Sequence, residues 1–365
     1  MRRTTEPTDP GRARGSALAR IAFLVYVLLV GYATLYPLAG WRSVGLSPFA
    51  YLSGPWPRYV TAFDIAVNLA GYVPLGFLAI AALYPRARGV PAFLVAVASA
   101  ALLSLVLEAA QSYLPARFST NLDVLCNVGG AALGAALGLH LRPLLPGGPL
   151  SQRRAAAFIA GTGTDFGLVL IGLWFFIQLN PAVLLFGAGD LRDLLAPWEG
   201  RARRPEFFVS IEAFTTAANL VAVSLLLSML VAPGRPVRGM VLGTVLAALV
   251  VKAAAVAILM RAENVFTWLT HGAQIGLALG IAAALAAVAL PRTARLITAA
   301  VLLMAATVLV NLAPPNPYLA DSLKVWQQGH FLNFNGLTRV VSALWPFIAL
   351  GYLIYLASRR RESLG

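Results

Sequence analysis

Charged residues are scarce in this sequence of 365 residues: Asp, Glu, Lys and Arg together make up 12%. The average for soluble domains is roughly 25%. Hydrophobic residues make up 59% and gather in several long apolar runs. A helix needs roughly 18 to 20 such residues to cross a bilayer. The composition therefore excludes an ordinary soluble domain and predicts an all-α polytopic membrane protein.

Cysteine and histidine are almost absent. Cys126 is the only cysteine, so no disulfide can form within the chain. The three histidines, His140, His271 and His330, are far apart and show no metal-ligand spacing. No serine, cysteine or histidine pattern is typical of covalent catalysis. The sequence thus predicts no metal and no cofactor.

Apolar runs separated by short polar loops fill most of the chain. A shift of about 144 residues places the first four predicted spans on spans five to eight, so we predict a degenerate four-helix repeat. In this registry Glu108 falls on Lys252 and Asn127 on His271. About ten spans are predicted, at residues 18–37, 62–84, 90–114, 122–142, 157–180, 206–231, 237–260, 266–290, 294–313 and 338–357.

The span pattern divides the chain into four parts. Residues 1–17 are polar and are predicted to be a disordered cytoplasmic tail. Residues 18–150 form a first four-helix membrane domain, and residues 151–291 form its degenerate second copy. Residues 292–365 add a two-helix segment with a short basic tail.

Arginines set the expected orientation, because loops rich in Lys and Arg stay in the cytoplasm. The short loops on the side of the N-terminus are basic and contain no acid, whereas acids dilute the opposite loops. We therefore expect a multi-pass protein of the bacterial cytoplasmic (inner) membrane with both termini cytoplasmic. The net charge of +14 comes from these span ends, so no nucleic-acid partner is predicted.

Residues 108–134 carry a polar pattern unlike the rest of the chain. Residues three or four apart on a helix share a face, so Glu108 and Gln111 point the same way at the end of one span. Asp123 and Asn127 begin a stripe on the next span. The stripe continues with Gly130 and Gly134, small residues where a partner helix can approach, and Arg117 and Asn121 lie at the bend.

A second acidic motif opens the preceding span. Asp64 and Asn68 share a face there, at the same depth as Glu108 and Asp123. Burying such groups in lipid is costly, so a functional site is the default hypothesis. The carboxylates suit general acid–base chemistry, a divalent cation, or the polar head group of a ligand. A structural polar network between helices is an equally simple alternative.

Together these motifs resemble the VanZ-like family of integral membrane proteins. That family is named for an accessory protein of bacterial resistance to the lipoglycopeptide antibiotic teicoplanin. The resemblance covers roughly residues 20–142 and implies envelope localisation and lipid or lipopeptide handling. Ser119 and Thr120 stand where some relatives have another acid, which weakens the cation-site hypothesis. The residues that carry the resemblance are Asp64, Asn68, Pro74, Leu75, Gly76, Glu108, Gln111, Arg117, Asp123, Asn127, Gly130 and Gly134.

We therefore expect a cell-envelope protein that binds or transports an amphiphile at an outward-facing polar site. Its expected partners are membrane lipids, a lipoglycopeptide such as teicoplanin, or a lipid-linked envelope precursor. One alternative is a membrane enzyme with Glu108 or Asp123 as acid or base and Arg117 on a phosphate. Another is a structural partner of a membrane complex. The predicted binding residues are Asp64, Asn68, Glu108, Gln111, Arg117, Asn121, Asp123 and Asn127.

Overall fold

The all-α prediction is confirmed by the structure, a computed structural model. It describes residues 16–43, 45, 47–141, 148–192, 204–260, 265–314, 316 and 332–362. Within these ranges the regular elements are helices, and the one β-type pairing is an isolated bridge between Phe158 and Val231. The tail predicted at residues 1–17 lies almost wholly outside the described residues.

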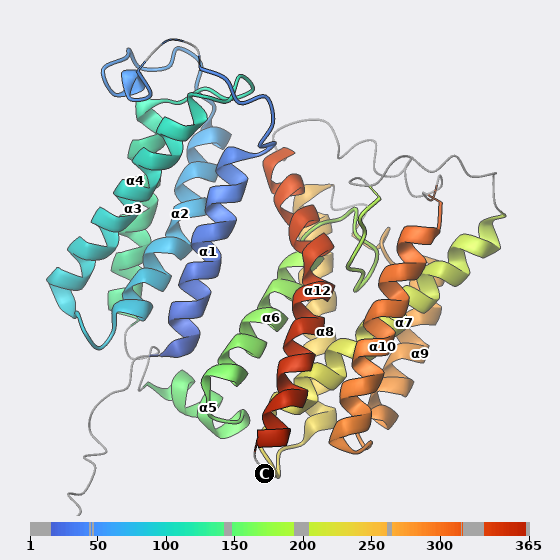
Figure 1. The fold of residues 1–365 in the computed structure, drawn as a ribbon. Helices are drawn as coiled ribbons and strands as arrows, with labels where there is room; N and C mark the ends of the chain where they lie inside the picture. Colours follow the sequence, from blue (N-terminus) through green and yellow to red (C-terminus); the bar gives the residue numbers. More distant parts are fainter. Residues whose placement is uncertain are drawn as a thin grey trace, which may run out of the picture. The chain divides into compact units, whose positions relative to one another are not determined.

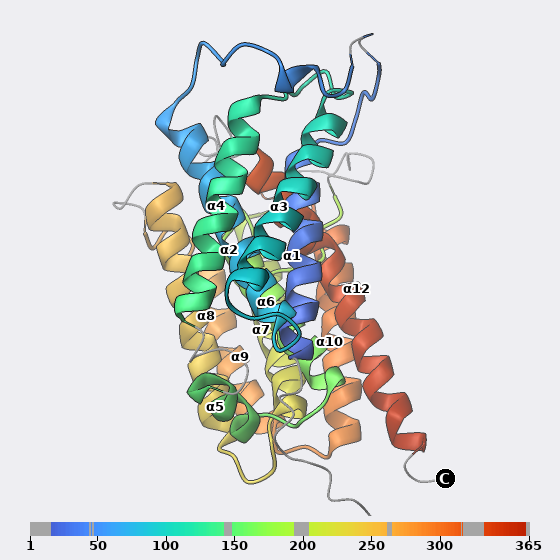
Figure 2. The same cartoon turned by 90° about the vertical axis from the view of Figure 1, so that its left-hand side faces the viewer.

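The chain forms two compact units, Met1–Ala156 and Ala157–Gly365. The helices of the first unit are α1 (Ala17–Leu35), the short 3-10 helix η1 (Ala50–Leu52), α2 (Ala62–Leu83), α3 (Gly89–Gln111) and α4 (Asn121–His140). The chain passes from the first unit to the second at the last residue of the polar helix α5 (Pro149–Ala157), which the sequence analysis did not predict. In both ribbon views α1–α4 run side by side as one bundle (Figures 1 and 2).

Side-chain caps define where the helices of the first unit begin. Thr61 and Asp64 form a capping box at the start of α2, where each side chain bonds the other residue's main-chain N–H. Thr120 caps α4 in a similar way, because its hydroxyl accepts from the N–H of Asp123 at 3.0 Å. These caps satisfy N–H groups that the first helical turn leaves without partners.

Glycines bring α2 and α4 into backbone contact. A Cβ on Gly134 would lie 1.9 Å from the carbonyl oxygen of Val73, and one on Gly130 would lie 2.1 Å from that of Leu69. Gly76 meets the carbonyl oxygen of Ala131 from the opposite helix in the same manner. The close approach predicted at Gly130 and Gly134 is therefore present, and its partner is α2.

The second unit is built around α7 (Pro205–Leu230), which is buried along most of its length. It packs against α9 (His271–Ala287) and α10 (Arg292–Leu312), and Gly276 of α9 meets the main chain of Ala213 in α7. The other helices are α6 (Thr162–Gln178), α8 (Val237–Leu259) and α12 (Leu332–Glu362).

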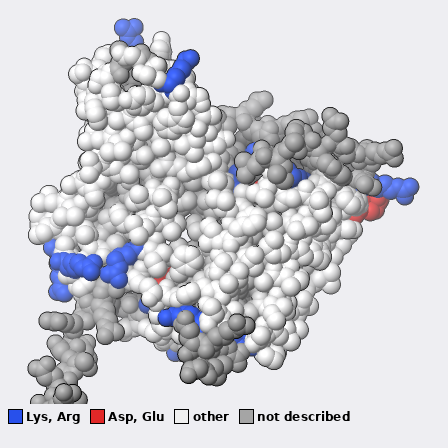
Figure 3. All heavy atoms as spheres, in the orientation of Figure 1, with Lys and Arg blue, Asp and Glu red and all other residues white. Residues whose placement is uncertain are grey.

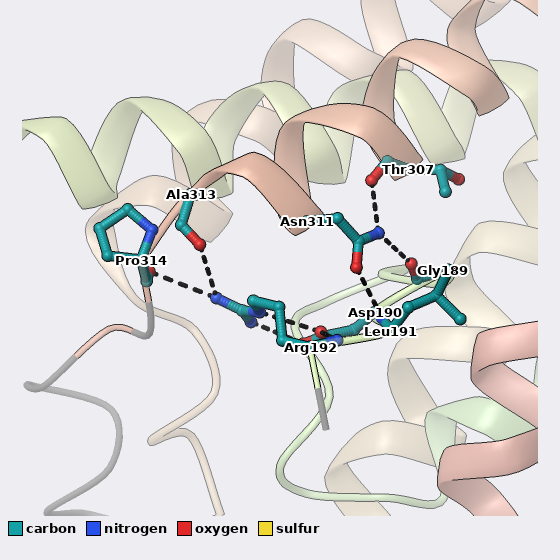
Figure 4. Close-up of polar contacts among 8 residues, drawn as sticks. All are labelled: Gly189, Asp190, Leu191, Arg192, Thr307, Asn311, Ala313 and Pro314. Carbon is teal, nitrogen blue, oxygen red and sulfur yellow. Dashed lines mark hydrogen bonds and ion pairs between the residues drawn. The ribbon is translucent and has the colours of Figure 1, made fainter. Parts of the chain in front are cut away.

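A buried irregular segment follows α6 in the second unit, and side chains satisfy its main-chain groups. The ammonium of Lys252, which has no exposed surface, donates to the carbonyl oxygens of Asn180 and Val183, both at 2.7 Å. Asn311 binds both Gly189 and Leu191, as Figure 4 shows. The segment ends at an ion pair of 2.6 Å between Arg192 and Asp190, and Arg192 also donates to the carbonyl oxygens of Ala313 and Pro314.

Within the described ranges, eight helices are long and apolar enough to cross a membrane: α1, α2, α3, α4, α7, α8, α10 and most of α12. The apolar helices α6 and α9 are shorter, with 17 residues each. The face drawn in Figure 3 is mostly uncharged, with a few separate groups of Lys and Arg side chains. These features are those of a multi-pass membrane protein, and each of the ten predicted spans overlaps one of these helices. The span count itself and the four-helix repeat stay predictions.

Candidate functional site

Three helices of the first unit each place a polar side chain at one level. Asn68 from α2 donates from Nδ2 to the carboxylate of Asp123 in α4. Glu108 from α3 is only 3% exposed, and its carboxylate accepts from the main-chain N–H of Thr120 at 3.3 Å. The hydroxyl of Thr120 in turn donates to Asp123 at 2.7 Å. We call Asn68, Glu108 and Asp123 the first polar layer; Thr120 links its two carboxylates.

One helical turn further into the bundle, the same helices provide a second polar layer, made of Tyr72, Ser104 and Asn127. Each member stands four residues from a member of the first layer, so it lies on the same face, about 6 Å along the helix axis. Asn127 donates from Nδ2 to the Ser104 hydroxyl at 3.0 Å. All three side chains are at most 5% exposed. A polar column of two layers thus runs into an apolar bundle.

The second layer contains a polar atom without a hydrogen-bond partner. The amide oxygen of Asn127 is buried and unpaired within the described part of the chain. The amide oxygen of Asn121, at the start of α4, is unpaired in the same sense. An unpaired buried polar atom costs roughly 1–3 kcal/mol and calls for an explanation. A bound polar group is one such explanation.

Two of the predicted site residues, Gln111 and Arg117, donate to main-chain carbonyl oxygens. Gln111 donates to the carbonyl oxygen of Thr34 at 2.8 Å. Arg117 donates through Nε and Nη2 to that of Tyr36, at 2.9 and 2.6 Å. These two residues satisfy carbonyls at the C-terminal end of α1, where a cation also meets the negative end of the helix dipole.

The loop between α1 and α2 is held over the same end of the bundle. Asn121 donates from Nδ2 to the carbonyl oxygen of Gly54 at 3.0 Å. The hydroxyl of Tyr51 donates to the carbonyl oxygen of Leu105 at 3.2 Å. Both contacts join this loop to helices that carry the polar layers, so the loop covers the region where the first layer begins.

Asp64 lies at the exposed start of α2 and serves the capping box with Thr61. It is close enough to Asp123 for their charges to interact, and Asp123 in turn interacts with Glu108. The structure therefore brings Asp64, Asn68, Glu108 and Asp123 together. Asn127 lies one turn deeper, while Gln111, Arg117 and Asn121 lie at the rim.

Burial and charge shift the pKa values of two residues outside the long helices, Arg117 and Tyr51. Burial lowers the pKa of Arg117, and the negative charge of Glu108 opposes that change. Burial raises the pKa of the Tyr51 hydroxyl, and the Glu108 carboxylate adds to the increase. The negative charge of Glu108 therefore acts on both the Arg117 guanidinium and the Tyr51 hydroxyl.

The sequence analysis missed two candidate site residues. Tyr72 and Ser104 stand within apolar runs, where a single polar residue attracts no notice. Their signal was the spacing, because Tyr72 follows Asn68 by one turn and Ser104 precedes Glu108 by one turn. Across the described ranges, no three His, Cys, Asp or Glu residues gather as a candidate metal site.

Comparison with known proteins gives one match. The family described as VanZ/LLP1 matches residues 23–142, a range that contains α2, α3 and α4 in full and most of α1. All members of both polar layers fall within it. No curated protein and no solved structure matches the chain.

Proposed function

Residues 23–142 are a VanZ-like domain, and from this premise we propose that its polar column binds the head group of an amphiphile. The amphiphile is an envelope lipid or a lipoglycopeptide such as teicoplanin, which the protein binds or transports. We place the protein in the bacterial inner membrane with both termini cytoplasmic. The column then opens toward the outer surface.

The observation that carries this proposal is the burial of Glu108 in the first layer together with the unpaired amide oxygen of Asn127 in the second. Ionisable residues within membrane helices are expensive and tend to mark ligand sites. The neighbouring helix surfaces are apolar, so acyl chains have a matching environment beside the polar column. A purely structural network would pair its own polar atoms, because unpaired ones destabilise it.

The test is mass spectrometry of amphiphiles that remain bound to the purified protein. Glu108→Gln keeps the shape of the side chain and removes its negative charge, so a specific amphiphile should be lost. Glu212→Gln is the matched control, because Glu212 is a buried carboxylate, 7% exposed, in α7 of the second unit. Equal retention by wild type and both variants would contradict the proposal and favour a structural role.

One observation favours an enzymatic alternative. Glu108 and Asp123 both bond to Thr120, so two carboxylates stand beside one another at a helix start. Paired carboxylates in different surroundings suit acid–base chemistry, here on a lipid-linked envelope precursor. The same mass spectra decide the matter: a converted product formed by wild type but not by Glu108→Gln would identify an enzyme.

A further inference from the structure

Two asparagines of the site, Asn127 in the polar column and Asn121 at its rim, have unpaired oxygens with a common chemistry. Asn127 uses its amide N–H to bond Ser104 and keeps its oxygen unpaired. Asn121 uses its amide N–H to bond Gly54 and also keeps its oxygen unpaired. In both residues the donor is occupied and the acceptor remains. A ligand that completes the column must therefore supply donors.

The charged groups of the site also favour a ligand that supplies donors. Asp64 lies within electrostatic reach of Asp123, and Asp123 within reach of Glu108, so three carboxyl groups line the mouth of the column. The nearby cation, Arg117, directs its Nε and Nη2 at the carbonyl oxygen of Tyr36. A phosphate or carboxylate at the tip of the head group would bring acceptors to acceptors. A cationic donor would be attracted.

From this pattern we infer that the head group bound by the column is a primary ammonium. An ammonium carries three N–H donors and one positive charge. It meets the Glu108 carboxylate at the first layer and the amide oxygen of Asn127 at the second. The inference deepens the proposed amphiphile site and rests on it. It assigns the class of ligand and makes a phosphate on Arg117 unnecessary.

The size of the ammonium group matters as well as its charge. The second layer is at most 5% exposed, and α2 and α4 approach to backbone contact beside it. A primary ammonium is compact, whereas a quaternary one carries three methyl groups and no N–H donor. The column is therefore expected to distinguish an ethanolamine head group from a choline head group with the same acyl chains.

The test uses two single-chain probes that differ only in the head group, dodecylamine and dodecanol. Ligand that binds only the folded state raises the melting temperature. At equal mole fraction in micelles near neutral pH, dodecylamine should raise the melting temperature of wild type but not of Glu108→Gln. Dodecanol should act equally on both proteins. Glu212→Gln should respond as wild type does.

Phosphatidylethanolamine and phosphatidylcholine with identical chains identify the source of the amine. Retention of phosphatidylethanolamine alone assigns a membrane lipid, whereas a response to dodecylamine without that preference assigns another amine.

Two results would overturn the inference. If both single-chain probes act alike on wild type and both effects vanish in Glu108→Gln, the amphiphile site exists but does not select ammonium. If neither probe distinguishes wild type from Glu108→Gln, the proposed site itself fails with it.

Discussion

Thr120 joins the two carboxylates of the first polar layer. Its main-chain N–H bonds Glu108, its hydroxyl donates to Asp123, and the same hydroxyl accepts from the N–H of Asp123 to cap α4. One side chain thus fixes the start of a helix and the spacing of two acids.

Thr120→Val keeps the size of this side chain and removes its hydroxyl. Loss of an N-cap costs roughly 1 kcal/mol, and the bond to Asp123 is lost in addition. We expect the free energy of unfolding to fall by about 1–2 kcal/mol, measured by thermal melting in detergent. Thr120→Ser, which keeps the hydroxyl, should melt close to wild type. Equal melting of wild type and the valine variant would show that the hydroxyl does not hold the layer.

Helical spacing alone predicted that Glu108, Asp123 and Asn68 would meet near one end of a bundle. It could not predict that Gln111 and Arg117 would bind the carbonyls of Thr34 and Tyr36. A carbonyl is present at every residue, so its partner leaves no signature in residue type. Such contacts across long stretches of chain follow from the packing of helices, which the sequence does not display.

The contact between α2 and α4 shapes the site, because it sets the distance between Asn68 and Asp123. Gly134 lies against the carbonyl oxygen of Val73, where a Cβ would come within 1.9 Å. Gly134→Ala should therefore force the helices apart and lower the free energy of unfolding by about 1–3 kcal/mol or more.

Gly129→Ala is the control in the same helix, because a Cβ there would meet the Leu69 side chain at an ordinary 3.7 Å. Alanine also favours a helix over glycine. This variant should match or exceed wild type in melting temperature. A Gly134→Ala protein as stable as Gly129→Ala would contradict the observed backbone contact.

Among the helices, the predicted repeat now has a physical correlate, although it remains a prediction. Arg117 bonds the carbonyl oxygen of Tyr36 after α1, and Lys252 bonds that of Asn180 after α6. Tyr36 and Asn180 correspond to each other at the offset of the repeat. In both units a cation therefore donates to a carbonyl oxygen just after the helix, α1 or α6. Arg117 and Lys252 do not occupy corresponding positions of the repeat. An alignment of the two halves does not reveal this correspondence, because the two cations stand at different positions in it.

For the whole molecule, the orientation proposed from arginines can be tested with single cysteines. Cys126 is buried and can be replaced by serine to give a cysteine-free background. Ser43 and Arg235 are both exposed, in the loops that follow α1 and α7. A membrane-impermeant thiol reagent should label Ser43→Cys in intact cells and should reach Arg235→Cys only after lysis. The reverse pattern would place the polar column on the cytoplasmic side.

The central claim is that the two polar layers form a ligand site and not only a helix-to-helix network. The most direct measurement is the amount of specific amphiphile retained by Glu108→Gln beside Glu212→Gln. A hydrogen bond to a charged group contributes about 1.5–3 kcal/mol, which corresponds to roughly a tenfold or greater loss of affinity. We predict that loss in Glu108→Gln and retention in Glu212→Gln. The same retained amphiphile in both variants, with unchanged melting temperatures, would contradict the account.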